Sequence, residues 1–259
     1  MENIIFIDTS YLIFYRYYAI MNWFKMTDRL KDVDIDNIVE NQEFTDKFEK
    51  KCLDFLKTVV KKYNPDRIFI CKDCPRKDIW RLQLHPTYKG TRDNFTGKNI
   101  FHIFYERVLP ILLKNPKYSL KECDSCEADD IVAIGVKTIK SVNSNCNITI
   151  FSSDHDYLQL LRYDNLDIVD LKFKSLKSKS IGENDLLYKI LLGDKSDNIS
   201  SVKKRLGKKT IDKLILENKL EEFINSNDSI KVNYEFNNNL INFEKIPNEL
   251  KSNIKQLFE

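Results

Sequence analysis

The sequence contains no apolar run of about 18 residues or more, and no stretch with the composition of a signal peptide. We therefore expect a soluble, intracellular protein that does not associate with membranes. Histidine is also scarce: His85, His102 and His155 are the only three, and none has the sequence context of a catalytic triad. Internal repeats and long linkers are absent as well. Because no histidine lies in such a context, any catalysis must rely on residue types other than histidine.

The 259 residues suffice for one large domain or two small ones, and the composition, 42% hydrophobic and 31% charged, is that of a globular protein. The net charge of +3 conceals an asymmetry. Acidic residues gather in a few short motifs, whereas lysines and arginines dominate other stretches. This pattern is typical of a protein that holds an acidic metal site against a polyanion.

Six cysteines are present, and four of them form two Cys-x-x-Cys pairs, Cys71 with Cys74 and Cys123 with Cys126. Structural zinc is one interpretation, because both pairs adjoin acidic residues and could meet in space. The other is a set of reduced, partly buried thiols. The separation of about 50 residues is long for a compact zinc ribbon, and Cys71 lies in an apolar strand. Both points favour the second interpretation.

Three short apolar runs, at residues 3–7, 67–72 and 148–151, each predict a buried strand that ends in acidic residues. The acids that follow them are Asp8, Asp73, Asp154 and Asp156. In an open α/β sheet, ligands bind at the carboxyl ends of the strands, so these carboxylates can share one edge. Further strands are expected at residues 118–123 and 166–171.

Two more acidic clusters could join this edge, Glu127-Ala128-Asp129-Asp130 and Asp194 with Asp197. Acids in the first turn of a helix are often dipole partners, which would explain one member of the first cluster but not all three. Nine carboxylates cannot lie together without compensation, because like charges raise one another's pKa values. Hard oxygen ligands favour Mg²⁺ or Mn²⁺ as the compensating cations.

Basic and aromatic residues alternate between residues 75 and 107, with Arg81 and Tyr88-Lys89-Gly90-Thr91-Arg92 as the most distinctive part. Basic groups neutralise phosphates and aromatic rings stack on bases, although such a patch can also be an ordinary solvated surface. Its place between two acidic motifs favours a functional role. Arg16, on the helix expected after Asp8, is a further candidate for binding phosphate.

A second basic segment follows the last acidic motif. Its candidate DNA-binding residues are Lys203, Lys204, Arg205, Lys208, Lys209 and Thr210. Before it, the Ser180-Ile181-Gly182-Glu183 capping-box spacing predicts a helix that stops at Gly193. A turn that leads into a helix with exposed amides and basic side chains can clamp a phosphate backbone.

Taken together, these motifs resemble the flap endonuclease and phage-type 5′-3′ exonuclease family, which has a PIN-like nuclease core. The matching motifs are Asp8-Thr9-Ser10, Arg81 through Tyr88–Arg92, Glu127–Asp130, Ser153–Leu160 and Gly193–Ile199. The resemblance extends from Asp8 to about Ile211. Thr9 replaces a usual glycine, and Ser201 and Lys204 stand where glycines are common in the clamp.

The resemblance implies an α/β fold with a mainly parallel central sheet, a helical arch at about 75–107 and a helical DNA clamp. Residues 1–180 would form the core with its arch, and residues 181–259 the clamp and a closing segment. It implies one metal at Asp8, Asp73, Glu127, Asp129 and Asp130, some of them through water, and a second at Asp154, Asp156, Asp194 and Asp197. Lys89 and Arg92 would contact the scissile phosphate, and Arg16, Arg81 and Tyr88 would contact DNA. Many family members also hold K⁺ at the clamp, but the replaced glycines depart from that pattern.

The implied activity is hydrolysis of DNA at a flap, a nick or a free 5′ end, with RNA–DNA hybrids as further substrates, by a monomer that uses two Mg²⁺ or Mn²⁺ ions. Two alternatives are a PIN-type ribonuclease and a DNA-junction-binding protein that does not cut. The clamp at residues 200–210 argues against the first alternative. The second is weakened because every motif acid is present.

Overall fold

The computed structural model describes residues 1–27, 29, 37–91 and 99–259. Its centre is a five-stranded sheet in the order β3-β2-β1-β4-β5, with every neighbouring pair parallel. The strands are β1 (Asn3–Asp8), β2 (Arg67–Cys71), β3 (Tyr118–Lys121), β4 (Asn147–Phe151) and β5 (Leu166–Val169). All five predicted strands are confirmed, and so is the α/β class with a mainly parallel sheet.

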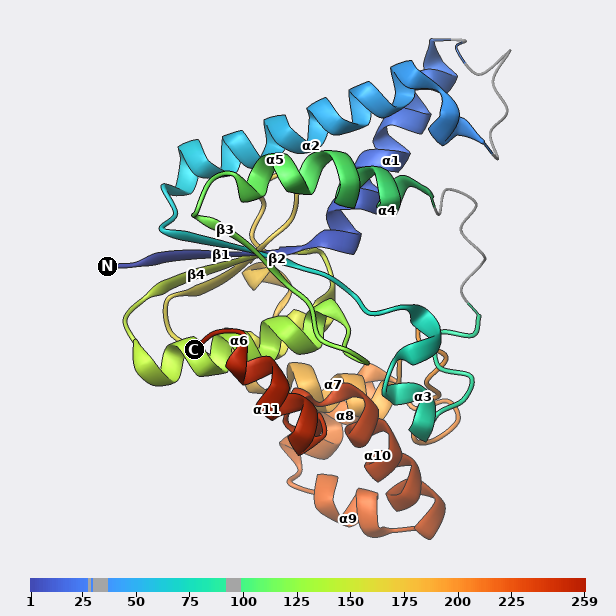
Figure 1. Cartoon of the computed structure of the whole chain (residues 1–259). Coiled ribbons are helices and arrows are strands. Elements are labelled where there is room, and N and C mark those ends of the chain that lie inside the picture. The colour runs from blue at the N-terminus through green and yellow to red at the C-terminus, as the bar shows by residue number, and fades with distance from the viewer. Residues whose placement is uncertain (28, 30–36, 92–98) are drawn as a thin grey trace.

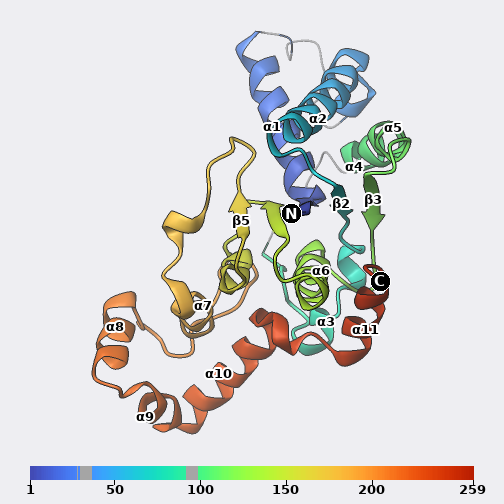
Figure 2. The same ribbon diagram turned by 90° about the vertical axis from the view of Figure 1, so that its left-hand side faces the viewer.

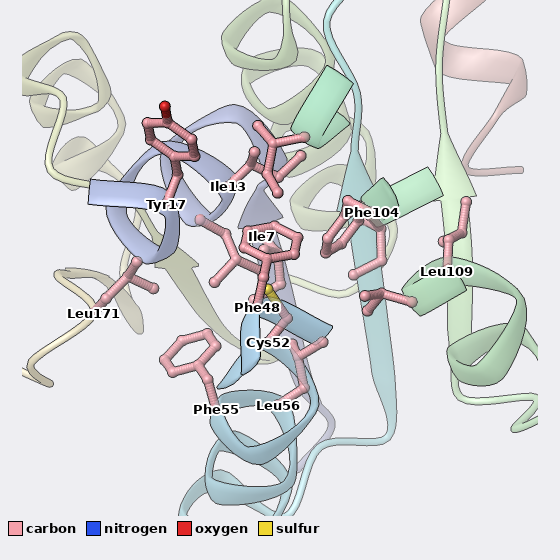
Figure 3. Close-up of a cluster of buried hydrophobic side chains, with 14 of the residues drawn as sticks. Ile7, Ile13, Tyr17, Phe48, Cys52, Phe55, Leu56, Phe104, Leu109 and Leu171 are labelled. Carbon is pink, nitrogen blue, oxygen red and sulfur yellow. The ribbon is translucent and has the colours of Figure 1, made fainter. Parts of the chain in front are cut away.

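One face of the sheet is covered by the helices drawn above it in Figure 1. They are α1 (Thr9–Met26), α2 (Gln42–Tyr63), α4 (Asn99–Ile103), a π-helix (Phe104–Val108) and α5 (Leu109–Leu113). Figure 3 shows Phe48, Cys52, Phe55 and Leu56 of α2 gathered near Ile7 of β1. These α2 residues repeat at helical spacing, so a single face of the helix is apolar. Burying each large side chain stabilises the fold by about 1.5–3 kcal/mol.

The opposite face is covered by α6 (Ala128–Val142), a 3₁₀ helix (His155–Arg162) and the C-terminal α11 (Asn248–Gln256). Successive side chains of a strand point to opposite faces, so Ile5 and Ile7 of β1 pack under α2 while Ile4 and Phe6 pack on α6. Strands buried on both faces read as continuous apolar runs, which explains the sequence pattern.

Four further helices form a smaller unit below the sheet, visible in Figures 1 and 2. They are α7 (Asp185–Leu192), α8 (Lys208–Leu216), α9 (Leu220–Asn225) and α10 (Asp228–Ile241). Leu191, Val202, Ile211 and Ile230 form its own small core. The domain division expected near residue 180 stays a prediction; this position lies between β5 and α7. After it, the chain returns to the sheet, where Phe258 packs on Phe69 with ring centroids 5.1 Å apart.

One local prediction is wrong. The helix predicted to begin at Ser180 begins at Asp185, because the Asp185 carboxylate accepts the Ile181 N–H at 2.9 Å and a hydrogen bond from Ser180 Oγ. Short 3₁₀ segments precede it, at Lys177–Lys179 and Gly182–Asn184. The stretch expected to form the helical arch, residues 75–107, contains a 3₁₀ turn (Arg76–Asp78), α3 (Arg81–Leu84), α4 and most of the π-helix, and residues 87–91 form turns. Residues 92–98 of the expected arch lie outside the described ranges.

Among the helices of the described ranges, none combines the length and the apolar character that a membrane span requires.

Candidate active site

The acids that follow β1, β2 and β4 meet at one edge of the sheet, as their positions predicted. Asp8, Asp73, Glu127, Asp129 and Asp154 line a pocket of about 220 Å³, together with Ser10, Tyr11, Phe14, Lys89, Ala128, Ser152 and Ser153. The topology explains this, because β1 lies between β2 and β4 and all three strands end on the same side. The N-terminus of α6 supplies Glu127 and Asp129.

Hydrogen bonds fix the two carboxylates from β1 and β2. Asp8 accepts the Tyr11 N–H at 3.0 Å, the Ser152 hydroxyl at 3.1 Å and the Tyr157 hydroxyl at 3.2 Å. Asp73 accepts the Ala128 N–H at 2.7 Å and the hydroxyl of Ser10. Each carboxylate is thus oriented by the elements around it, while one side still faces the pocket.

The carboxylates of this pocket carry more negative charge than the surrounding protein neutralises. Burial, then repulsion from Asp73, raises the pKa of Asp8 to about 7. Burial and the neighbouring Asp130 raise the pKa of Asp129 well above its usual range. Such shifts mark a site that gains by binding cations, and its hard oxygen donors suit divalent ions such as Mg²⁺. The residues therefore fit the metal that the sequence predicts.

A second group of acids lies beside the first. Carboxylate oxygens of Asp156, Asp194 and Asp197 come within 4.8 Å of one another, as do those of Glu127, Asp129 and Asp130. The Tyr88 hydroxyl links the two groups, at 3.1 Å from both Glu127 and Asp197. All nine predicted acids are therefore brought together.

Asp154, which the sequence assigns to the second group, lies with the first. It lines the pocket with the first group and also accepts the Asp156 N–H at 2.9 Å. Asp130 differs from the other acids because four donors occupy its two oxygens. These donors are Arg81 Nη1 and Nη2, Trp80 Nε1 and the Glu127 N–H, at 2.8–3.1 Å.

Lys89 reaches into the pocket, where its ammonium group forms an ion pair with Glu127. Burial opposes ionisation of Glu127, but Lys89 and Arg81 outweigh it and hold the pKa of that carboxyl below its usual range. The backbone of Lys89 has a φ of 55°, and its N–H donates to the Asp197 carbonyl at 3.0 Å. Strained backbone of this kind is common at functional sites. Arg92, the other predicted catalytic residue, lies outside the described ranges.

Two of the side chains predicted to contact DNA are buried, and their contact with DNA stays a prediction. Arg81 is 2% exposed and Tyr88 is 4% exposed, and both face the acidic groups rather than solvent. Arg16 is half-buried, with its guanidinium 5.1 Å from the ring of Phe55.

The predicted clamp residues lie on the surface of the smaller helical unit. Lys203, Lys204, Arg205, Lys208, Lys209 and Thr210 are all exposed. Lys203 and Lys204 line a groove of about 1010 Å³, together with Ser226 and Asn227, which precede α10, and Asn233 of α10. A wide groove with lysines along one wall has the character of a phosphate-backbone site.

Lys189 is a site residue that the sequence reasoning missed. It forms ion pairs with Asp194, at 2.9 Å, and with Asp156. Burial opposes ionisation of Asp194, but Lys189 and the hydrogen bonds from Ser196 together outweigh it and lower the pKa of that carboxyl to about 2. One signal could have revealed it: Lys189 is the only basic residue of the otherwise largely apolar α7.

The thiols give no support to the zinc interpretation. Cys71 is buried under α6, whereas Cys74 lies beyond the end of β2 and packs near Ile79. In the part of the chain that the structure describes, no three of the cysteines bring their sulfur atoms within ligand distance of one another. All six are free.

Comparison with known proteins agrees with this geometry. Residues 3–190 match the family model for the 5′-3′ exonuclease N-terminal resolvase-like domain. Ribonuclease H of Enterobacteria phage T4 is 31% identical over 212 residues, which cover 73% of this chain and 68% of the phage protein. The 5′-3′ exonuclease of Mycoplasma pneumoniae is 26% identical, with coverage of 83% and 72%. DNA polymerase I of Borreliella burgdorferi is 27% identical, but the chain spans 24% of its length.

Solved structures share the fold. The T5 D15 protein co-crystallised with metal ions superposes with a TM-score of 0.69 at 16% identity, covering 99% of this chain and 98% of that one. The T5 D15 flap endonuclease in complex with DNA and metal ions gives a TM-score of 0.66. The chain belongs to the 5′-3′ exonuclease family. It is a 5′ nuclease, a hydrolase of phosphodiester bonds in DNA.

Proposed function

We propose that the protein cuts DNA at 5′ flaps, nicks and free 5′ ends, and that it also removes RNA paired with DNA. The observation that carries this proposal is the convergence of nine carboxylates beside an exposed basic groove. The relatives include a ribonuclease H and 5′-3′ exonucleases, and a structural neighbour is a flap endonuclease. Both domains, residues 1–180 and 181–259, would act together in a monomer.

Two Mg²⁺ or Mn²⁺ ions suit the two acidic groups. Asp8, Asp73, Glu127, Asp129 and Asp154 would hold the first, and Asp156, Asp194 and Asp197 the second. When bound, the ions supply Lewis acidity for activating water and for stabilising the leaving oxygen. Asp130 would act indirectly, because its oxygens are already occupied by Arg81, Trp80 and the Glu127 N–H.

The side chains around the pocket would position the substrate. Lys89 places a positive charge beside the acids, where it can stabilise charge that develops on a scissile phosphate. We keep Arg92 as its proposed partner from the sequence. The ring of Phe14 lines the pocket and is braced by Phe101 at 5.2 Å, so it offers a stacking surface for a terminal base.

The clamp lysines would hold the duplex at a distance from the reacting bond. Phosphate contacts of this kind set register and affinity but carry no sequence information. K⁺ at the clamp stays a prediction, as does the phosphate contact of Arg16.

A 5′-labelled flap duplex tests the proposal, incubated with Mg²⁺ and separately with EDTA, beside a matched single-stranded RNA. We expect Mg²⁺-dependent cutting near the flap junction. Cutting of the RNA alone would support the ribonuclease alternative. Binding without cutting, in Mg²⁺ or Mn²⁺, would support the junction-binding alternative.

Substitutions test the metal assignment. Asp156→Asn and Asp194→Asn should abolish cleavage but leave DNA binding within about threefold of the original protein, because the clamp is untouched. Retained cutting by either variant would refute the assignment. Lys89→Ala should lower kcat far more than it raises KM, and unchanged turnover would remove Lys89 from the mechanism.

A further inference from the structure

Arg81 is the buried centre of a polar network that joins three parts of the chain. Its Nη2 and Nη1 atoms lie 2.8 and 2.9 Å from the two oxygens of Asp130, and Nη1 also lies 3.1 Å from Glu127 Oε2. Its Nε donates to the carbonyl of Leu240 at 2.8 Å. A guanidinium offers its donors in a rigid planar fork, which a lysine cannot reproduce.

Asp130 serves this network by neutralising Arg81. Besides the guanidinium, it accepts the Trp80 indole N–H at 3.0 Å and the backbone N–H of Glu127 at 3.1 Å. The Asp130 side chain is therefore held on both oxygens, and it holds Arg81 in turn. Because Asp130 holds the guanidinium, the Nη1 group that donates to Glu127 is fixed in one position.

The hydrogen bond from Arg81 to the Leu240 carbonyl connects the network to the helical clamp. Leu240 is the penultimate residue of α10, so its carbonyl has no partner within the helix. A guanidinium at a helix C-terminus is favourable, because the helix dipole is negative there. Gln159, three residues after Asp156, likewise donates to the next carbonyl, that of Ile241, at 3.1 Å. The end of α10 is thus bonded to Arg81, which contacts the first acidic group, and to Gln159, on the 3₁₀ helix that carries Asp156 of the second.

We propose that Arg81 is a positioning residue that fixes the Glu127 carboxylate for the nuclease reaction and ties it to the C-terminal end of α10. The inference rests on the proposed function, because it assigns Glu127 to the metal site. The sequence predicts that Arg81 contacts DNA. Under this proposal its side chain instead orients the Glu127 carboxylate and does not touch the nucleic acid.

Arg81→Lys tests the proposal, because it keeps the charge but cannot reach Glu127, Asp130 and Leu240 together. We expect kcat on a flap duplex to fall about tenfold, with KM nearly unchanged, since loss of an outer-shell partner typically costs at least that much. Calorimetric titration of the DNA-free protein with Mn²⁺ should show weaker binding, also by about tenfold. The titration is independent of whether the protein cuts DNA.

Arg162→Lys is the matched control. Arg162 forms an ion pair with Glu244 at the surface, away from the acidic pocket. We expect unchanged kcat and unchanged Mn²⁺ affinity for this variant. Circular dichroism establishes that each variant is folded at the assay temperature.

Trp80→Phe supplies a second test in case Arg81→Lys does not fold. It removes one hydrogen bond to Asp130 and keeps the guanidinium, so kcat and Mn²⁺ affinity should each fall by about threefold. Weakened DNA binding with unchanged kcat and Mn²⁺ affinity in Arg81→Lys would overturn the proposal in favour of direct DNA contact. If Arg81→Lys has lower thermal stability but unchanged kcat and unchanged Mn²⁺ affinity, the proposal is overturned in favour of a purely structural role. If the original protein binds Mn²⁺ but cuts no DNA, the proposed function fails while the effect of Arg81 on the metal site can still be measured.

Discussion

A Cβ atom at residue 193 would lie 2.4 Å from the carbonyl oxygen of Ile199, which places the backbones of Gly193 and Ile199 in direct contact. Gly193 also has a φ of 72° and a ψ of −172°, a region that only glycine occupies readily. The loop that begins here carries Asp194 and Asp197. The position of both acids therefore depends on the absence of a side chain at residue 193.

We expect Gly193→Ala to destabilise the protein by more than about 2 kcal/mol, because strain and collision with backbone add together. Gly182→Ala is the matched control, since Gly182 has nearly the same φ, 73°, but open space around its Cα. The control should cost about 1 kcal/mol from backbone strain alone. Urea unfolding measures both changes, and equal losses would contradict the role given to the contact with Ile199.

Lys189 is expected to act as an internal counter-ion of the metal-free protein. Lys189→Met keeps much of the side-chain volume but leaves Asp156 and Asp194 without their cation, so their repulsion is uncompensated. We expect a lower Tm in EDTA and a larger rise of Tm on adding Mg²⁺ than in the original protein. Thermal melts at several Mg²⁺ concentrations measure this, and an unaltered response to Mg²⁺ would rule out the counter-ion role.

Glu244 should make the fold sensitive to acid. Partial burial opposes its ionisation, but Lys137, at 2.6 Å, and Arg162 outweigh this and lower the pKa of Glu244 below its usual range. Its contribution is therefore complete above the unfolded-state pKa of about 4.3 and is lost as the pH falls through the lower folded-state value. Because these contacts lie near the surface, the contribution is about 1 kcal/mol or less.

Glu244→Gln tests this pH dependence. The difference in unfolding free energy between the original protein and the variant should be constant from pH 6 to 8, and should shrink as the pH falls below about 4. The comparison cancels the titration of the other carboxylates. A difference that grows on acidification would have the wrong sign for a lowered pKa.

Phe258 should anchor the C-terminal segment to the sheet. Its ring packs on Phe69 and Phe6, and a Cβ at Gly135 of α6 would lie 2.6 Å from it. Phe258→Ala should cost about 2–4 kcal/mol, less than a fully buried phenylalanine because the ring is partly exposed. Val232→Ala, at a side chain that is 61% exposed, should change stability by less than about 0.5 kcal/mol. Similar effects in both variants would show that the segment does not depend on this contact.

Much of the sheet and of the acidic site could be predicted from the sequence because the signals are local. An apolar run that ends at Asp8 or Asp73 is visible within eight residues, and parallel strands bring such ends to one edge. The sequence places the start of the following helix too early, because Ser180 and Glu183 have capping-box spacing, whereas Asp185 accepts the hydrogen bonds from Ser180 Oγ and the Ile181 N–H.

Residues whose partners lie far along the chain were harder to interpret. Arg81 stands in a basic and aromatic stretch that suggests nucleic-acid binding, yet its partners are Asp130 and Leu240, 49 and 159 residues away. Lys189 lies 33 residues from Asp156. Sequence shows that such residues are charged, and only the packed fold shows which charges they face.

The order of the strands also bears on how the enzyme is made. The acidic groups draw on residues from Asp8, near the start, to Asp197, and the network beneath them closes with Leu240. A chain still emerging from the ribosome can complete β1 to β4 before the loop that bears Asp194 and Asp197 is made. A nascent chain therefore cannot carry the complete set of acids before residue 197 is added, and we expect no cutting activity until then.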